Sequence, residues 1–409
     1  MRVFIVLICT LAITVGMAGC AADQGAPTQE STAKDSTTFP QGLMVALAAL
    51  DKDADGKPVP LPARLGILTL EDGEWRYRFF EDPDSNVFHK AMAWKPSAGR
   101  DGVMTFGGTQ AIVKLWSPGE EPTVLWQEDF GGKFSRMRDA EIADVLGEGS
   151  SAIAIGTHDQ GVVAVLRPDG QQGFEVIRLD EEPSTFVHEI EIGDLDGDGS
   201  LEIYATPSAP NKLDGTPQPG KVVRYQPARD EGRVVVADLG DRHAKEILVT
   251  DIEGDGRDEL YVSVEAVSGG RVEIRRFDHG TDPSGGRVIV ELDDTLCRFL
   301  TAGDVDGDGQ KELIAASYKS GIWLLRPEGE QWSVTSIDKE SSGFEHAAIL
   351  TDLDEDGVDE LYVASDKHDE IRSYRWHDGQ PVREVIYRHT DGLSRFTWNL
   401  TSAPLSMLP

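Results

Sequence analysis

A ten-residue acidic motif occurs four times between residues 194 and 361 and constrains the fold of this chain more than any other feature. Each copy has carboxylates at positions 1, 3, 5 and 9 and a glycine at position 6. An apolar residue at position 10 then begins a run of β-forming residues. The copies span 194–203, 251–260, 304–313 and 352–361. Four copies of one loop, each followed by a strand, predict a repeat protein.

The spacing of these carboxylates suits calcium, which takes six to eight oxygen ligands from carboxylates and backbone carbonyls. The glycine permits the turn that brings the carbonyl of position 7 toward the side chains of positions 1, 3 and 5. The last carboxylate comes at position 9 from a strand, not at position 12 from a helix as in the EF-hand. We expect about four Ca²⁺ ions, one in each loop. The predicted ligands are Asp194, Asp196, Asp198, Ser200 and Glu202; Asp251, Glu253, Asp255, Arg257 and Glu259; Asp304, Asp306, Asp308, Gln310 and Glu312; and Asp352, Asp354, Asp356, Val358 and Glu360.

An acidic hairpin turn that binds nothing is the simpler interpretation of one such loop. Four carboxylates in register in every copy favour a metal, because without an ion these charges would repel one another. Two further loops depart from the motif. The loop 51–56 has Val59 where the last carboxylate should be, and the copy that begins at Asp144 has Leu146 at position 3 and Ala152 at position 9. We expect the Asp144 loop to have lost its metal. We also favour an empty 51–56 loop over one that holds an ion.

The chain is strongly acidic, with a formal net charge of −33. Nucleic acid is excluded as a partner, because binding to phosphates requires a basic face. The sequence also contains no GxSxG, HExxH, P-loop or CxxC motif, so no familiar catalytic pattern is present.

The first twenty residues resemble the start of a bacterial lipoprotein. Arg2 precedes an apolar run at 3–15, which is too short to span a membrane as a stable helix. The run leads to the sequence Met-Ala-Gly-Cys at 17–20, which resembles the lipobox, in which cleavage occurs before a cysteine that is then lipidated. An ordinary secretory signal with an incidental cysteine is the alternative.

These features predict a signal peptide at 1–19, a lipid-anchored flexible linker at 20–41 and one folded domain at 42–409. The linker begins at the lipidated Cys20 and is rich in Ala, Thr, Ser, Gln and Pro, a composition that cannot bury a core. By resemblance to known sorting behaviour, Ala21 after the cysteine favours an outer-membrane lipoprotein of the cell envelope. We expect membrane contact through this anchor only. Cys297 is then the only cysteine of the folded domain, which excludes an intramolecular disulfide.

Short apolar runs alternate with Gly-, Asp- and Pro-rich turns from Leu43 onward, without a long helical period, which predicts an all-β chain. The four motifs start 57, 53 and 48 residues apart, and each interval holds four such runs. Four strands in about 50 residues are typical of one β-propeller blade. The same register extends upstream over 134–178 and 86–128.

The two ends of the chain complement each other. Residues 43–80 supply only three strands, and one further run follows the last complete unit, at 395–402. A C-terminal strand that completes the first blade closes the ring and removes exposed sheet edges. We therefore predict a seven-bladed β-propeller of four-stranded blades. A β-solenoid would need capping ends instead.

The acidic loops on four-stranded repeats of about 50 residues resemble the FG-GAP/VCBS repeat family, which includes the propeller of integrin α chains, fungal lectins and several carbohydrate-active enzymes. The resemblance covers roughly residues 43–402. It implies a calcium-stabilised propeller whose metal loops lie on the face opposite the usual ligand face. It implies no single activity, because this fold supports adhesion, lectin and enzymatic functions alike.

A basic or protonatable residue stands six positions before the first aspartate of the four intact loops and of the Asp144 loop, near the start of each predicted innermost strand. His89 and Arg395 stand at comparable places in the two remaining blades. Such a ring, at the end where propellers usually bind ligands, is a candidate trap for a uronate, sulfate, phosphate or carboxylate. In the alternative interpretation these side chains only pair with neighbouring acids such as Glu189, Glu191, Glu141 or Glu345. The seven candidates are His89, Arg138, His188, Lys245, Arg298, His346 and Arg395.

The sequence therefore favours a calcium-binding, lipid-anchored propeller that acts as an interaction module for an envelope protein or a glycan, which the basic ring suggests is anionic. The alternative is a carbohydrate-active enzyme, similar to a polysaccharide lyase, acting on an anionic glycan. Histidine and arginine near neutral pH suit proton abstraction beside a carboxylate.

Overall fold

The computed structural model describes residues 38–96, 99–171, 173–212 and 214–409. All of these residues belong to one compact unit, Ser36–Pro409. The predicted signal peptide, Cys20 and the linker up to residue 37 lie outside the described residues, and their assignments stay predictions.

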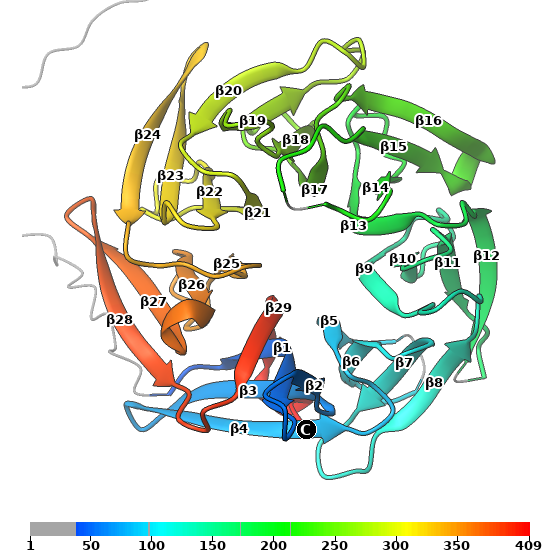
Figure 1. The fold of residues 1–409 in the computed structure, drawn as a ribbon, viewed down its shortest axis with the longest axis vertical. Coiled ribbons are helices and arrows are strands. Elements are labelled where there is room, and N and C mark those ends of the chain that lie inside the picture. Colours follow the sequence, from blue (N-terminus) through cyan, green and yellow to red (C-terminus); the bar gives the residue numbers. More distant parts are fainter. Residues whose placement is uncertain (1–37, 97–98, 172, 213) are drawn as a thin grey trace, which may run out of the picture. The chain divides into compact units, whose positions relative to one another are not determined.

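Seven antiparallel sheets surround the centre of the ring as the blades of a propeller (Figure 1). We number the blades 1 to 7 in chain order; in blades 2 to 7 the strands follow one another from the innermost to the outermost. Blades 2 to 4 contain β5 (Phe88–Trp94), β6 (Gly102–Gly107), β7 (Ala111–Trp116) and β8 (Thr123–Glu128); β9 (Met137–Ala143), β10 (Ala152–Thr157), β11 (Val163–Pro168) and β12 (Phe174–Asp180); and β13 (Phe186–Gly193), β14 (Glu202–Ser208), β15 (Lys221–Gln226) and β16 (Glu231–Asp238). Blades 5 to 7 contain β17 (Ala244–Thr250), β18 (Glu259–Val264), β19 (Val272–Phe277) and β20 (Arg287–Leu292); β21 (Cys297–Gly303), β22 (Glu312–Ser317), β23 (Ile322–Glu328) and β24 (Gln331–Asp338); and β25 (Ala348–Thr351), β26 (Glu360–Ser365), β27 (Glu370–His377) and β28 (Gln380–Arg388).

Blade 1 joins the two ends of the folded unit. Its innermost strand is the C-terminal β29 (Ser394–Pro404), which pairs with β1 (Gln41–Lys52) along most of its length. β3 (Ala63–Glu71) and β4 (Glu74–Asp82) complete the blade. The predicted seven-bladed propeller, with a first blade closed by the C-terminal strand, is confirmed.

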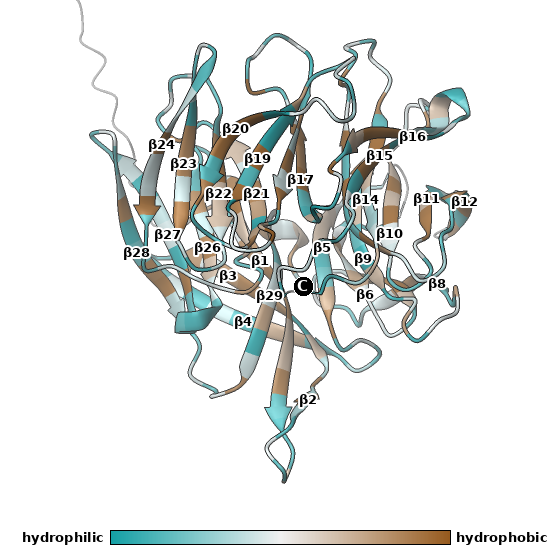
Figure 2. Ribbon diagram, turned by 45° about the horizontal axis from the view of Figure 1, so that its top comes forward, coloured by the Kyte–Doolittle hydropathy of each residue, from teal (hydrophilic) through white to brown (hydrophobic). Residues whose placement is uncertain are grey.

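One short strand was not predicted. β2 (Pro58–Pro60) pairs with the end of β1, and Figure 2 shows this hairpin projecting beyond the ring. Two of its three residues are prolines, a composition tolerated only at a sheet edge. The 51–56 loop forms the tip of this hairpin and is fully exposed. It lies between β1 and β3, the second and third principal strands of blade 1.

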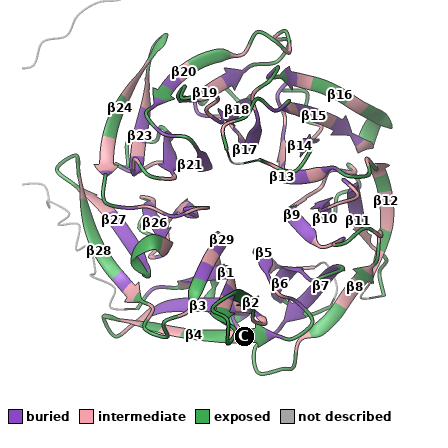
Figure 3. Ribbon diagram, in the orientation of Figure 1, coloured by how far each residue is buried: buried purple, intermediate pink, exposed green. Residues whose placement is uncertain are grey.

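The core consists of apolar layers between neighbouring sheets. The second strand of each of blades 2 to 7 is buried along its whole length, whereas the outermost strands alternate or are largely exposed (Figure 3). A short continuous apolar run bounded by turns is the pattern expected of a strand covered on both faces. Helical structure in the described residues is limited to three 3-10 turns, η1 (Pro227–Arg229), η2 (Asp366–His368) and η3 (Leu405–Met407). No described helix is long and apolar enough to cross a membrane.

Candidate functional site

The innermost strands of blades 4 to 7 place the candidate metal loops and the basic residues at opposite ends of the ring. In blade 6, Arg298 lies at the start of β21, and the loop that begins at Asp304 follows the end of the same strand. Seven extended residues span roughly 20 Å. We call the end where the innermost strands begin the mouth. Because the length of an innermost strand separates the mouth from the metal loops, a small ligand bound at the mouth would not touch these loops.

The first aspartate of each acidic loop organises the turn. In blade 6, Asp304 accepts the backbone N–H of Asp308 at 3.2 Å and that of Gly309 at 2.8 Å. Gly309 has φ +84°, a conformation that residues other than glycine seldom adopt. Equivalent bonds occur in the other three loops. The motif thus builds one loop conformation four times.

Each loop brings three carboxylates together, with one oxygen from each lying within 4.8 Å of the others. In blades 4, 6 and 7 these carboxylates belong to positions 1, 3 and 5, as predicted. In blade 5 the group is Asp251, Asp255 and Glu259. Glu253, the predicted ligand at position 3, instead pairs with Arg276 at 2.5 Å.

The glutamate at position 9 is buried in all four loops. Glu312 shows how it is held: the N–H of Val305 donates to one oxygen at 3.1 Å, and Arg326 pairs with the other at 3.2 Å. Burial raises the pKa of Glu360 to about 7, because Arg375 offsets only part of the desolvation cost. The sequence motif did not reveal these arginines. They come from the third strand of each blade, at Arg224, Arg276, Arg326 and Arg375.

The donor set of each loop fits a hard divalent cation. All side-chain donors are carboxylate oxygens, the ligands that Ca²⁺ prefers. Four carboxylates face one guanidinium in the loops of blades 5, 6 and 7 and two in the loop of blade 4, so an excess of negative charge remains that a divalent ion would reduce. Each group supplies three of the five predicted ligands of its loop; in blade 5 these three include the buried Glu259 and leave out Glu253.

Neighbouring loops are also tied to one another. Asp359, at position 8 of the blade 7 loop, accepts the N–H of Asp304 in blade 6 at 2.9 Å, and its own N–H donates back to Asp304 at 2.9 Å. Asp258 and Asp194 form the same pair between blades 5 and 4. Ordering one loop therefore helps to order the next blade.

The two degenerate loops keep the turn but not the group of carboxylates. Asp144 accepts the N–H groups of Glu148 and Gly149 at 2.9 and 2.7 Å, as in the intact loops. In the exposed 51–56 loop, Asp53 accepts the N–H of Asp55 at 2.9 Å. Neither loop is among the four described carboxylate groups that could hold an ion.

At the mouth, six of the seven innermost strands share an irregularity that directs one side chain out of the ladder. The pairing with the neighbouring strand shifts register at the same place in blades 1 to 6. Such β-bulges re-aim a side chain and are frequent beside functional sites. The bulges lie at Trp398 in blade 1 and at His89, Arg138, His188, Lys245 and Arg298 in blades 2 to 6.

Five of the seven predicted ring residues therefore lie at these bulges, and two do not. The bulge of blade 1 carries Trp398, whereas Arg395 lies three residues away and pairs with Asp369 and Asp391. In blade 7, Glu345 occupies the mouth. His346 turns aside with φ 59° and bonds to Ser317 and Ser341. The assignment of Arg395 and His346 to the ring is thus corrected to Trp398 and Glu345.

The ring divides into two halves of different charge. Glu345 pairs with Lys245 and also with Arg298, the latter at 3.1 Å. Burial alone would raise the pKa of Glu345, but Lys245 and Arg298 hold it below its ordinary value. On this side the alternative interpretation is correct, because neighbouring acids neutralise the basic residues. In the other half, Arg138 bonds to both His89 and His188, and these three side chains line one small cavity with Trp398.

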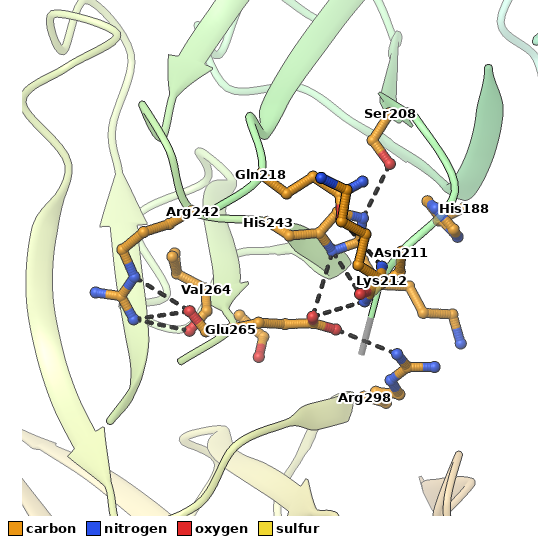
Figure 4. A network of polar contacts seen from close by, with 12 residues as sticks. His188, Ser208, Asn211, Lys212, Gln218, Arg242, His243, Val264, Glu265 and Arg298 are labelled. Atoms are coloured by element: carbon orange, nitrogen blue, oxygen red, sulfur yellow. Dashed lines mark hydrogen bonds and ion pairs between the residues drawn. The ribbon is translucent and has the colours of Figure 1, made fainter. Parts of the chain in front are cut away.

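Beside the neutralised half lies a polar network that the sequence did not indicate (Figure 4). Glu265 pairs with Arg298 at 3.3 Å and accepts a bond from Asn211 at 2.6 Å. His243 lies between Ser208, at 2.9 Å, and Glu265, at 3.5 Å. This network forms part of the wall of a cavity of about 440 Å³ that also includes Tyr318 and Phe344. No sequence motif links these residues, because they come from different blades.

Acidic side chains follow the mouth residues along the innermost strands. Lys90 pairs with Asp139, at 3.1 Å, and with Glu141. Burial raises the pKa of Glu246 to about 8, although the N–H of Leu300 donates to its carboxylate at 2.7 Å. This acidic layer holds blades together, since Glu246 and Asp139 each bond to the backbone of the next blade.

Comparison with known proteins supports the fold and nothing finer. Neither a protein-family model nor a curated protein sequence matches this chain. It is similar in structure to a protein from Bacteroides fragilis provisionally named a 6-phosphogluconolactonase. The TM-score is 0.52 and the identity 12%, over 90% of this chain and 99% of the other. A protein of unknown function from Desulfotomaculum acetoxidans has a TM-score of 0.48 and 12% identity, over 87% of this chain and 98% of that one. The chain is therefore a seven-bladed β-propeller, a fold suited to an interaction module.

Proposed function

We propose that this protein is a calcium-stabilised binding module, anchored to the cell envelope through Cys20, which takes its ligand at the mouth of the propeller. The observation that carries the proposal is the fourfold repetition of one loop geometry, in which three carboxylate oxygens lie within 4.8 Å of one another. Calcium is the hard divalent cation that such oxygen sets bind. About four ions are expected per chain, as the FG-GAP/VCBS-like motif implies.

In this proposal the ions act as staples and not as the ligand site. The loops lie at the far end of the innermost strands from the mouth. In two of the three pairs of neighbouring loops, position 8 of one loop bonds to the first aspartate of the loop before it, as Asp359 does to Asp304. When the free calcium concentration is about 100 times the Kd of a site, the bound ion adds roughly 2.7 kcal/mol to the free energy of unfolding. Calcium would thus order the blades that present the mouth.

Thermal unfolding of the full chain with calcium and with excess EGTA tests the proposal. We expect a large decrease in the melting temperature on chelation, which added calcium reverses and magnesium restores poorly. A melting curve that does not change with EGTA would contradict the metal role. Binding of envelope proteins or glycans to the calcium-loaded chain, measured on an array and by pull-down, then tests the interaction role.

A further inference from the structure

The half of the mouth between blades 1 and 4 contains a buried cation without a counter-charge. The side chain of Arg138 is 9% exposed, and within the part of the chain that the structure describes it forms no ion pair within 4.0 Å. Its two terminal nitrogens bond instead to His89 at 3.3 Å and to His188 at 3.1 Å. A buried charge is costly unless it is paired, so a partner from outside the chain would stabilise this site.

The two histidines are set by Arg138 to donate hydrogen bonds. A guanidinium has only donors, so His89 Nε2 and His188 Nδ1 must accept from it. Burial and then the charge of Arg138 lower the pKa of both imidazoles well below the usual value, which keeps them neutral. A neutral imidazole that accepts at one nitrogen carries its proton on the other. His89 Nδ1 and His188 Nε2 are therefore N–H donors.

These donors and two more lack any partner. Among the described residues, no hydrogen-bond acceptor meets His89 Nδ1, His188 Nε2, Arg138 Nε or Trp398 Nε1, all of which are buried atoms. The four side chains line the same cavity of about 20 Å³, about the space that one water or one ligand oxygen fills. Four N–H donors around one positive charge form a built site for a negatively charged oxygen acceptor.

The remaining wall of the cavity contains no ion-pair partner for Arg138 among the described residues, and it includes Asn399, whose Oδ1 is a further buried atom without a hydrogen-bond partner there. Asp139 lines it but pairs with Lys90 and accepts the N–H of Ile190. Glu189 also lines it, and burial together with Asp139 raises the pKa of this carboxyl well above its ordinary value, which disfavours its charged form. Lys245 lies 5.2 Å from the Trp398 ring on the other side and pairs with Glu345.

Aromatic rings continue outward from this cavity. Trp398, Phe396, Phe344 and Tyr318 contact one another in series, with ring centres 6.4, 5.8 and 6.0 Å apart, and all four are half-buried. The last two line the cavity of about 440 Å³. A ligand whose anionic end enters the small cavity could thus lay a sugar or apolar body against this series of rings, where aromatic faces contribute contact area.

We infer that the mouth binds an organic monocarboxylate, with the carboxylate on Arg138, His89, His188 and Trp398 and the body of the ligand on the adjoining aromatic rings. This inference rests on the proposed binding role of the mouth and names its ligand class. Arg138 is the only cation at the six described bulges that has no ion pair, since Lys245 and Arg298 both pair with Glu345, so a single carboxylate matches the site better than a polyphosphate does.

Isothermal titration of the full chain, in calcium, with glucuronate, acetate, sulfate and glucose tests the inference. We expect glucuronate to bind more tightly than acetate, and glucose to bind not at all. The variant Arg138→Gln should weaken glucuronate binding at least about tenfold, the effect of losing a hydrogen bond to a charged group. Trp398→Phe keeps the aromatic ring but removes its N–H and should weaken binding less, which provides a second variant if Arg138→Gln does not fold.

Arg395→Gln is the matched control, because Arg395 is a buried arginine paired with Asp369 and Asp391 outside the small cavity. It should bind glucuronate as the wild type does. The inference is overturned if glucuronate does not bind, if Arg138→Gln and Trp398→Phe bind it unchanged, if glucose competes equally, or if sulfate is preferred over both carboxylates. Melting of the same samples with EGTA keeps the two proposals apart, because a chain that responds to calcium but not to carboxylates contradicts only this inference.

Discussion

Glu345 holds together the neutralised half of the mouth, and Glu345→Gln tests this directly. The side chain is fully buried and pairs with both Lys245 and Arg298. Arg298 has a second ion-pair partner, Glu265 at 3.3 Å, which remains when Glu345 is neutralised. Lys245 has no such reserve, because Glu345 is the only described carboxylate that pairs with it. One buried ammonium therefore loses its counter-charge, a change that costs roughly 3–5 kcal/mol.

Urea unfolding of the calcium-loaded chain, followed by tryptophan fluorescence, measures this loss as a change in the free energy of unfolding. Glu330→Gln is the control, because the side chain of Glu330 is 97% exposed and has one ion pair, with Arg287 at 3.2 Å; exposed pairs contribute about 0–1 kcal/mol. The double variant Lys245→Met with Glu345→Gln should recover much of the lost stability, since it leaves no unpaired ammonium.

The stabilisation that the Glu345 ion pairs provide should decrease in acid. Because the folded-state pKa of Glu345 lies below its unfolded value, its ion pairs stabilise the fold above the ordinary carboxyl pKa of about 4.3 and are lost as the pH falls through the folded-state value. The difference between wild type and Glu345→Gln should therefore be constant near neutral pH and shrink in acid. A loss no larger than that of Glu330→Gln at pH 7 would refute the neutralised arrangement.

Three further predictions follow from the loops, the acidic layer and the anchor. Asp359→Ala removes the acceptor of the Asp304 N–H and should cost about 1–3 kcal/mol, whereas Asp359→Asn keeps an acceptor and should cost less; equal losses in urea unfolding would contradict the link between loops. Burial raises the pKa of Glu246 to about 8, so the wild type loses stability as the pH rises from about 4.3 toward 8. Glu246→Gln should therefore melt progressively higher than wild type between pH 5 and pH 8, and a constant difference would count against this. Cys20→Ser should abolish incorporation of labelled palmitate and release the protein from the membrane fraction; labelling that persists would exclude Cys20 as the anchor.

The ring architecture was predictable because local signals repeat. Apolar runs covered on both faces, turns at fixed spacing and the Asp–Gly loops each recur in blade after blade, and the strand at 395–402 matches the gap at the N-terminal end. β2 escaped prediction because two prolines in three residues argue against a strand anywhere except at an edge. The carboxylates at positions 1, 3 and 5 were found for the same reason as the fold, since residues so near in sequence share one turn.

The mouth was predicted in part because counting residues back from the acidic loops works only while the backbone stays regular. In blade 7 the left-handed conformation of His346 (φ 59°) puts Glu345 where His346 was expected, and a shift of one residue exchanges which side chain faces the centre. Blade 1 has no acidic loop after its innermost strand, so no motif defined the register of that strand, and Trp398 took the place assigned to Arg395. The pairing of Arg298 with Glu265 joins two blades and leaves no local pattern.

Calcium content is the most direct test of the central claim. The full chain, equilibrated with calcium and freed of unbound ions, should contain about four Ca²⁺ ions per molecule by mass spectrometry of the metal. The variant Asp304→Asn, which changes one loop only, should contain about one ion fewer and unfold at a lower temperature. A wild-type chain without bound calcium, or an Asp304→Asn chain with the same calcium content and stability as wild type, would contradict the account.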